Sequence, residues 1–169
     1  MNKMFSRVLI GLSMFFSHQS FGQFLYEQQL KLLYKNTVPV ISAANLNKLL
    51  QANKLVYLLD IRSSREYAVS HLAGARFINH ETFKAEQIKN IPKNAKVVVY
   101  CSVGVRSEQV GEKLIKAGYQ QVHNLYGGIF SWKNEGFPVV NQQQQPTDSV
   151  HTYNKYWSVW LRNGIKVYE

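Results

Sequence analysis

The sequence predicts an α/β domain in which a parallel β-sheet is covered by helices on both faces. Two short apolar runs, 55–59 and 97–100, are rich in Val and Leu. Continuous apolar runs of this length are typical of interior strands of a parallel sheet, which are buried on both faces. Helical patterns separate these runs from each other and from further short strand signals, and such alternation is typical of β-α-β units.

The first half is expected to contain three strands and four helices. Leucines spaced among Gln, Glu and Lys predict an amphipathic helix at 24–34. Pro39 cannot donate to a central ladder, which assigns 38–41 to an edge strand. Ser42 and Ser64 have the chemistry of helix N-caps. The elements that follow the edge strand are then helix 43–50, strand 55–59, a short helix from Ser64, strand 76–78 and helix 81–88.

In the second half, strand 97–100 carries the only cysteine, Cys101, into a short turn. Ser107 is expected to open the next helix, and Gly118 to end it. A further strand at 122–125 and a helix at 129–134 complete the expected domain. Near the C-terminus, apolar residues alternate on both sides of Asn163-Gly164, a pair that favours the tight turn of a β-hairpin.

The N-terminus has the pattern of a secretory signal peptide. Lys3 and Arg7 precede an apolar core that is too short for a stable membrane span, and Ser20-Phe21-Gly22 is a small-x-small cleavage site. We therefore expect a periplasmic or secreted protein with no membrane span after cleavage. The expected organisation is a signal peptide at 1–22, an N-terminal helical extension at 23–37, the α/β domain at 38–140, a Gln-rich linker at 141–150 and a C-terminal hairpin tail at 151–169.

The formal net charge is +10, but the lysines are scattered along the chain. No basic stripe with interleaved aromatic residues is visible, and export makes nucleic acid an improbable partner. The excess charge suits small anions or an acidic membrane surface better. Neither a metal nor a cofactor is expected.

The place of Cys101 favours a thiolate. In open α/β sheets, ligands bind where strands end and helices begin. There the backbone N–H groups of 102–106, the first helical turn and the Arg106 guanidinium would all stabilise an anion, while Gly104 allows the tight turn. A structural cysteine is the alternative. The Cys-x4-Arg-Ser turn after an apolar strand favours the reactive thiol, and an exported chain with one cysteine has no internal disulfide partner for it.

Several motifs occur in the order found in one known family. They are Asp60-Ile-Arg62, Glu66-Tyr67, His71-Leu-Ala-Gly74-Ala75, Cys101-x-x-Gly104-x-Arg106-Ser107, Leu125-Tyr-Gly127-Gly128 with Trp132, and Gly136-Phe-Pro138. Together they resemble a single rhodanese-type sulfurtransferase domain over about 38–140. Ser70 departs from the family pattern, in which a glycine commonly precedes the histidine.

The resemblance implies a sulfurtransferase that carries sulfur as a persulfide on Cys101. The donor would be thiosulfate or a persulfide, and the acceptor cyanide, a thiol or another protein. Backbone N–H groups would cradle the terminal sulfur, and Arg106 would stabilise the thiolate and orient an anionic donor. The residues of that cradle would be Ser102, Val103, Gly104, Val105 and Arg106.

Five further residues are less closely tied to the chemistry. Arg62 either contacts the substrate or forms a structural pair with Asp60, and both interpretations stay open. Ser107 supports the loop. His71 lies in a Gly-Ala turn and is expected to be structural, and Trp132 is expected in the core.

Two other function classes compete with sulfur transfer. Phosphatases of related folds hold a Cys-x5-Arg loop around phosphate, but Cys101 and Arg106 enclose four residues, and a shorter loop suits a single sulfur atom better. The second rival is a non-catalytic binding or sensing module that keeps the fold. The intact Cys and Arg count against it, whereas the extensions at both ends suit a partner-specific role.

Overall fold

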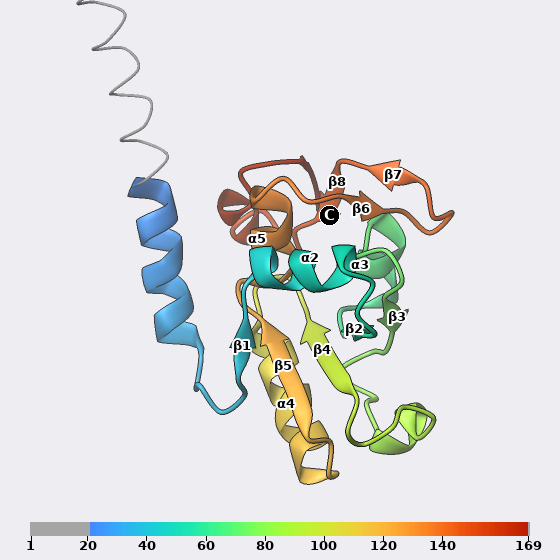
Figure 1. Cartoon of the computed structure of the whole chain (residues 1–169). Coiled ribbons are helices and arrows are strands. Elements are labelled where there is room, and N and C mark those ends of the chain that lie inside the picture. The colour runs from blue at the N-terminus through green and yellow to red at the C-terminus, as the bar shows by residue number, and fades with distance from the viewer. Residues whose placement is uncertain (1–20, 169) are drawn as a thin grey trace, which may run out of the picture. The chain divides into compact units, whose positions relative to one another are not determined.

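The computed structural model describes residues 21–168 (Figure 1). Most of the expected signal peptide lies outside these residues, so it stays a prediction. Residues 21–33 form a helix that includes the last two residues of the expected signal peptide and most of the expected N-terminal extension. These residues belong to one compact unit, and the chain from Tyr34 onward forms the second. Among the described residues, no helix is both long and apolar enough to cross a membrane.

A five-stranded parallel sheet forms the centre of the second unit, in the order β1-β5-β4-β2-β3. Its strands are β1 (Val40–Ile41), β2 (Tyr57–Asp60), β3 (Arg76–Phe77), β4 (Lys96–Tyr100) and β5 (Gln121–Leu125). The strand after Pro39 is an edge strand, as predicted from its missing N–H donor. Strand β4, which leads to Cys101, lies in the middle.

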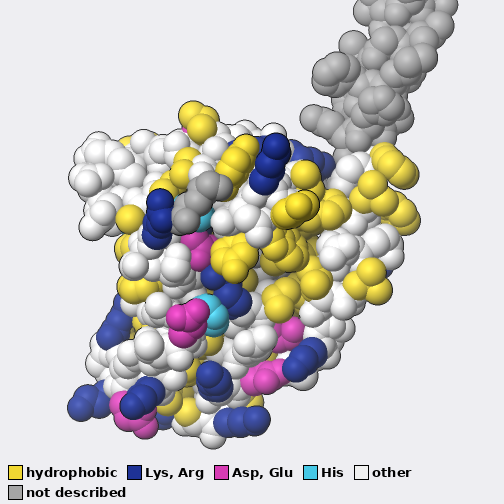
Figure 2. Space-filling model, turned by 180° about the vertical axis from the view of Figure 1, so that it is seen from behind, with side chains coloured by type: hydrophobic (Ala, Val, Ile, Leu, Met, Phe, Trp, Pro, Cys, Tyr) yellow, Lys and Arg dark blue, Asp and Glu magenta, His cyan; other side chains and the backbone are white. Residues whose placement is uncertain are grey.

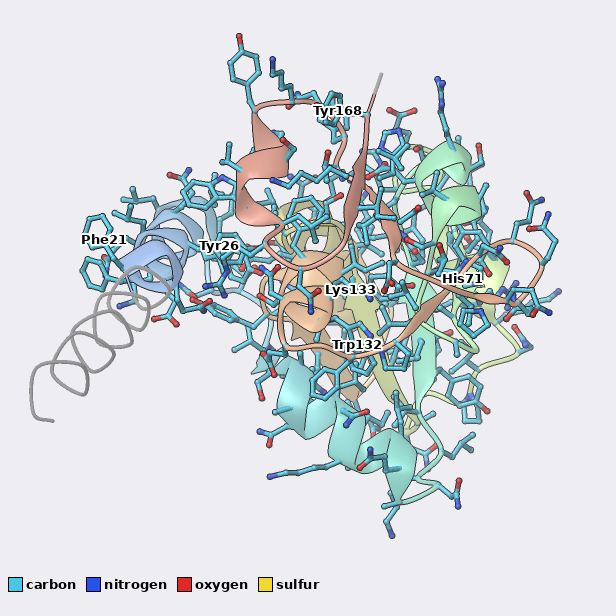
Figure 3. The ribbon with its side chains drawn as sticks, turned by 90° about the horizontal axis from the view of Figure 1, so that it is seen from above. Phe21, Tyr26, His71, Trp132, Lys133 and Tyr168 are labelled. Atoms are coloured by element: carbon cyan, nitrogen blue, oxygen red, sulfur yellow. The ribbon has the colours of Figure 1, made fainter. Side chains whose placement is uncertain are left out.

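Helices cover both faces of this sheet, as the fold class requires. The helices are α2 (Ala43–Gln51), α3 (Ser64–Val69), α4 (Val105–Lys116) and α5 (Gly128–Asn134), with a 3-10 turn η1 (Ala85–Ile88). Figures 1 and 3 show α2 on one side of the sheet and α4 on the other. Val110 and Leu114 of α4 join Val97 and Val99 of β4 in one buried cluster, so burial of apolar surface fixes α4 against the sheet.

Several helix boundaries differ from the expected ones, three of them near the site or with a clear local cause. Ser63 rather than Ser64 caps α3, because Ser63 and Glu66 satisfy each other's backbone N–H groups in a capping box. Helix α4 begins at Val105 rather than at Ser107, because Gly104 takes a left-handed conformation and turns the chain directly into the helix. The helix expected at 81–88 shortens to η1, because Lys84 is extended, with φ −132°.

The C-terminal extension contains a β-hairpin, but not at the expected residues. Strands β6 (Val139–Val140) and β7 (Pro146–Thr147) pair antiparallel across 141–145. The stretch 141–150 was expected to be a linker, and this is corrected. Asn141 Oδ1 accepts the N–H groups of Gln143 and Gln145, and the Gln142 N–H reaches the Ala68 carbonyl, so the polar residues close an ordered turn.

The β-hairpin expected around Asn163-Gly164 does not form, and this prediction is wrong. Strand β8 (Ser149–His151) pairs with β9 (Ile165–Val167) in parallel, and the intervening Trp157–Trp160 forms a 3-10 turn, η2. Asn154 Oδ1 accepts the Trp157 N–H and starts this turn. Asn134 of α5 accepts the N–H groups of Arg162 and Asn163, which ties the Asn-Gly pair to the domain instead of a hairpin partner.

Candidate active site

Cys101 lies where β4 ends and before α4 begins, as predicted. Its side chain is buried, with 1% of its surface exposed, and it forms no disulfide. The Gly104 N–H donates to Cys101 Sγ at 3.1 Å, and the Ser107 hydroxyl donates to it at 3.6 Å. Burial of the sulfur is therefore accompanied by donors aimed directly at it.

Hydrogen-bond donors outside the loop 101–104 fix its backbone by bonding its carbonyl groups. Each of these carbonyls accepts a hydrogen bond from a residue beyond the loop. Because a trans peptide places its C=O and N–H on opposite sides, an outward carbonyl turns the next N–H inward. The pairs are Ile129 N–H to Cys101 O at 2.9 Å, Phe130 N–H to Ser102 O at 3.1 Å, Tyr34 Oη to Val103 O at 2.7 Å and Asn124 Nδ2 to Gly104 O at 2.9 Å.

Two of these four donors come from the first turn of α5, and their approach depends on Gly128. Its φ is +57°, a left-handed conformation, and a Cβ at this position would overlap the carbonyl oxygens of Cys101 and Ser102. Gly128 therefore allows the first turn of α5 to bring its N–H groups close to the loop.

Arg106 is fixed by a carboxylate beside the loop. Its two terminal nitrogens bond the two oxygens of Glu66 at 2.7 and 2.9 Å, and Nη2 also bonds Ser102 Oγ at 3.0 Å. Ser102 in turn donates to Glu66 at 2.8 Å. Burial raises the pKa of Glu66, but the hydrogen bonds and charge of Arg106 outweigh it and lower the pKa to about 2. The guanidinium is thus held in one place with 21% of its side chain exposed.

The electrostatic balance at Cys101 favours the thiolate. Burial raises the pKa of the thiol, since a charge is costly in an apolar interior. The charge of Arg106, the hydrogen bonds from Ser107 and the Gly104 amide act in the opposite direction, and together they bring the pKa below its ordinary value. The result is a buried sulfur that ionises more readily than a free cysteine.

Arg62 does not lie where a substrate could reach it, and the substrate contact predicted for it is corrected. Its side chain is fully buried and bonds both oxygens of Asp60, with Nη2 to Asp60 Oδ2 at 2.6 Å. The same Nη2 donates to the Ser70 carbonyl. The Asp60–Arg62 pair therefore links the end of β2 to the end of α3, which is the structural alternative left open by the sequence.

His71 and Trp132 have the structural environments expected of them (Figure 3). The His71 ring stacks on Tyr67 at 3.8 Å between centroids, and its two nitrogens contact the Tyr67 carbonyl and Gln144 Nε2. Trp132 is buried on α5 and donates to the Pro138 carbonyl. Neither side chain is free to act on a substrate.

Sequence reasoning missed the roles of three residues around the loop. Glu66 stood in a recognised motif, but no role was predicted for it because its distance from Arg106 spans 40 residues. Asn124 lies within a strand, where an amide gives no signal. Tyr34 precedes all the motifs from which the domain was recognised, and only the fold brings its hydroxyl to the Val103 carbonyl.

Aromatic, apolar and basic side chains all occur on the exposed surface. The Tyr153 ring of the C-terminal extension lies over the Arg106 guanidinium, 5.7 Å from its Cζ, and is more than half exposed. Figure 2 shows Lys and Arg side chains dispersed over the face drawn, with apolar side chains gathered on its upper half. Within the described part of the chain, no group of three or more His, Cys, Asp or Glu could hold a metal ion.

Comparison with protein families gives a match to the Rhodanese-like domain over residues 42–135. A sulfurtransferase from Allochromatium vinosum is 35% identical over 100 residues, which cover 59% of this chain and 92% of that protein. A tRNA uridine(34) hydroxylase from Buchnera aphidicola is 33% identical over 110 residues, covering 59% of this chain. The matched part covers only about a third (33%) of the length of that hydroxylase.

Solved structures agree with this match. The rhodanese-like domain protein from Staphylococcus aureus is 28% identical with a TM-score of 0.55, over 62% of this chain and 98% of that one. A rhodanese-related protein from Thermoplasma volcanium is 31% identical with a TM-score of 0.53, over 60% and 97%. The matched segment contains Cys101 and its loop, and the chain belongs to the rhodanese-like domain family.

Proposed function

We propose that this chain is an exported rhodanese-like sulfurtransferase that moves a sulfane sulfur through a persulfide on Cys101. The observation that carries the proposal is the environment of Cys101 Sγ, which accepts hydrogen bonds from Gly104 and Ser107 beside the Arg106 charge. Groups preorganised around a sulfur anion stabilise both the attacking thiolate and the persulfide that replaces it. The sulfurtransferase among its relatives supports the same reaction class.

With thiosulfate as donor, the Cys101 thiolate attacks the outer sulfur of the donor. A new S–S bond forms to Cys101, the S–S bond of thiosulfate breaks, and sulfite leaves with that electron pair. The charge balances, since a thiolate and a dianion give a persulfide anion and a dianion. In the second half, a cyanide ion or thiolate attacks the outer persulfide sulfur, becomes thiocyanate or a new persulfide, and restores the Cys101 thiolate.

The size of the loop supports sulfur transfer over phosphate hydrolysis. Four residues separate Cys101 from Arg106, and the guanidinium is already bonded to both oxygens of Glu66. A loop of four intervening residues suits a single sulfur atom better than the phosphate group held by the Cys-x5-Arg loops of phosphatases. We therefore expect no phosphatase activity with p-nitrophenyl phosphate.

The proposal also covers where the protein acts and what it binds. The sequence pattern of residues 1–22 favours export to a periplasm or to the medium, and the partners would be a small sulfur-donor anion and a thiol, cyanide or protein acceptor. Lys and Arg side chains are dispersed over the face drawn in Figure 2, and nucleic acid is not among the proposed partners. A non-catalytic binding module is the alternative, and it requires Cys101 to stay unloaded with every donor.

A donor and acceptor screen tests the function. The full chain is incubated with thiosulfate or glutathione persulfide, together with cyanide or a thiol, and thiocyanate, sulfite and new persulfide are measured. Activity that disappears in Cys101→Ser supports the proposal. Turnover of p-nitrophenyl phosphate that is lost in the same variant would favour the phosphatase, and inactivity with every donor would favour the binding module.

A further inference from the structure

We infer that Tyr34 is a positioning residue for the sulfur-binding loop, an inference that rests on the proposed function of Cys101. Tyr34 precedes the segment that matches the rhodanese-like family, which begins at residue 42. The active-site loop of this chain would then be completed by a residue that precedes the matched segment. Three observations lead to this assignment.

The first observation is the pair of hydrogen bonds at the Tyr34 hydroxyl. It donates to the Val103 carbonyl at 2.7 Å and accepts the Gly127 N–H at 2.9 Å. Tyr34 is 7% exposed, and its ring meets that of Tyr126 edge-on at 5.6 Å. One buried hydroxyl therefore joins the Cys101 loop to the turn that leads into α5, and removal of it would leave both backbone groups without this partner.

The second observation is the peptide unit to which Tyr34 is bonded. The Val103 carbonyl and the Gly104 N–H belong to the same planar trans peptide and point in opposite directions. While Tyr34 holds the carbonyl outward, the Gly104 N–H points at Cys101 Sγ, 3.1 Å away. The tyrosine thus acts on the sulfur through one rigid amide, without touching the sulfur itself.

The third observation is that the Tyr34 hydroxyl occupies the space beside Gly104 that a side chain would otherwise fill. Gly104 has φ +105°, and a Cβ there would overlap the Tyr34 hydroxyl, so the glycine leaves the space that the hydroxyl fills. The residues after Tyr34 are anchored as well. The N–H groups of Lys35 and Thr37 both donate to the Glu108 carboxylate in the first turn of α4, at 2.9 Å each.

Tyr34→Phe tests the inference, with Tyr119→Phe as a matched control. Tyr119 is also buried and donates to a backbone carbonyl, that of Ile88 at 2.7 Å, outside the loop. The readout is the rate of Cys101 alkylation by iodoacetamide against pH, together with thermal melting. We expect Tyr34→Phe to shift the profile to higher pH and to slow alkylation at pH 6.5 by about three- to tenfold, while Tyr119→Phe keeps the wild-type profile.

Alkylation needs no sulfur donor, so this test fails or succeeds separately from the proposed function. An unchanged profile in Tyr34→Phe would overturn the inference even if the wild-type chain transfers sulfur. Unfolding of Tyr34→Phe while Tyr119→Phe stays folded would overturn it too, because the hydroxyl would then support the fold and not the thiolate. A shifted profile in a chain that transfers no sulfur would support Tyr34 and contradict the sulfurtransferase.

Discussion

At Cys101, a few hydrogen-bond donors and one nearby positive charge stabilise a buried thiolate. Burial alone would keep the thiol protonated, because the interior solvates an anion poorly. The Gly104 amide, the Ser107 hydroxyl and the Arg106 charge replace the lost water, and the pKa falls below its ordinary value despite burial. Arg106 acts from a fixed position, since Glu66 bonds both of its terminal nitrogens.

Replacement of Arg106 tests this balance. In Arg106→Gln the thiol loses its nearest positive charge and faces an unpaired Glu66 carboxylate, so both effects raise the pKa of Cys101. We expect alkylation of Cys101 at pH 7 to slow by about tenfold or more, with the pH profile moved upward. The exposed Arg65→Gln, which removes the same charge from the surface of α3, should leave the profile unchanged.

A double variant separates the two effects. Arg106→Gln combined with Glu66→Gln removes the guanidinium and the carboxylate together, so it should recover part of the rate lost in Arg106→Gln. Equal rates in the single variant and the wild-type chain would show that the guanidinium does not stabilise the thiolate.

At the scale of elements, the site is a junction between the β4–α4 loop and the β5–α5 turn. The two were recognised as separate motifs from their sequences, but the N–H groups of Ile129 and Phe130 donate to the loop carbonyls beyond the ends of the adjacent strands β5 and β4. Gly128 makes this approach possible, since a Cβ would overlap two of those carbonyls. The close packing of these two turns defines the direction of the loop amides.

Gly128→Ala should therefore destabilise the fold more than a glycine with the same backbone requirement elsewhere. Gly136 also has a left-handed φ, +84°, but a Cβ there would meet nothing within 4 Å. Both alanine variants lose about 1 kcal/mol from backbone strain. The overlap at Gly128 adds at least about 2 kcal/mol, which corresponds to a melting temperature lower by about 4 °C or more than that of Gly136→Ala. Equal melting temperatures would contradict this packing.

The ion pair between α3 and α4 gives the fold an acid-sensitive contribution. The pKa of Glu66 falls from 4.5 to about 2 in the folded chain, because Arg106 outweighs the effect of burial. A lowered folded-state pKa stabilises the fold above pH 4.5, and this stabilisation is lost as the pH falls toward 2. Urea unfolding of wild type and Glu66→Gln should thus differ most above pH 5 and converge toward pH 2. If the difference in unfolding free energy between the two chains does not change with pH, the ion pair makes no such contribution.

The fold was predictable from local signals where burial and capping decide the structure, as with β4, the edge strand β1 and helix α2. The site was predictable only in part. Cys101, the amides and Arg106 follow from one continuous stretch of chain, so their proximity is encoded locally. Tyr34 and Arg62 are different, because the hydroxyl that reaches Val103 and the burial that removes Arg62 from solvent depend on contacts between distant segments.

At the scale of the whole molecule, the segment that follows the family domain is part of the packed fold. Composition suggested a linker at 141–150, because Gln-rich stretches contain little apolar surface. The turn is nevertheless ordered by Asn141 Oδ1, by the Gln142 contact to Ala68 and by the pairing of His71 with Val140. The two distant anchors are backbone groups of α3 and of the turn that follows it, and no local pattern reveals them.

Limited proteolysis with proteinase K tests that packing. A linker would be cut first, whereas we expect the early cuts to fall outside 141–150. Asn141→Ala removes the side chain that accepts two N–H groups and should make this turn cleavable. Gln143→Ala, an exposed position in the same turn, serves as the control and should stay resistant. A first cut within 141–150 of the wild-type chain would contradict the ordered turn.

Mass spectrometry of the full chain after treatment with thiosulfate or glutathione persulfide tests the central claim most directly. We predict a gain of one sulfur, about 32 Da, located on Cys101 and removed by cyanide or a thiol, with no gain in Cys101→Ser. A wild-type chain whose mass is unchanged by every donor, or a sulfur adduct that persists in Cys101→Ser, would contradict a persulfide carried at this site.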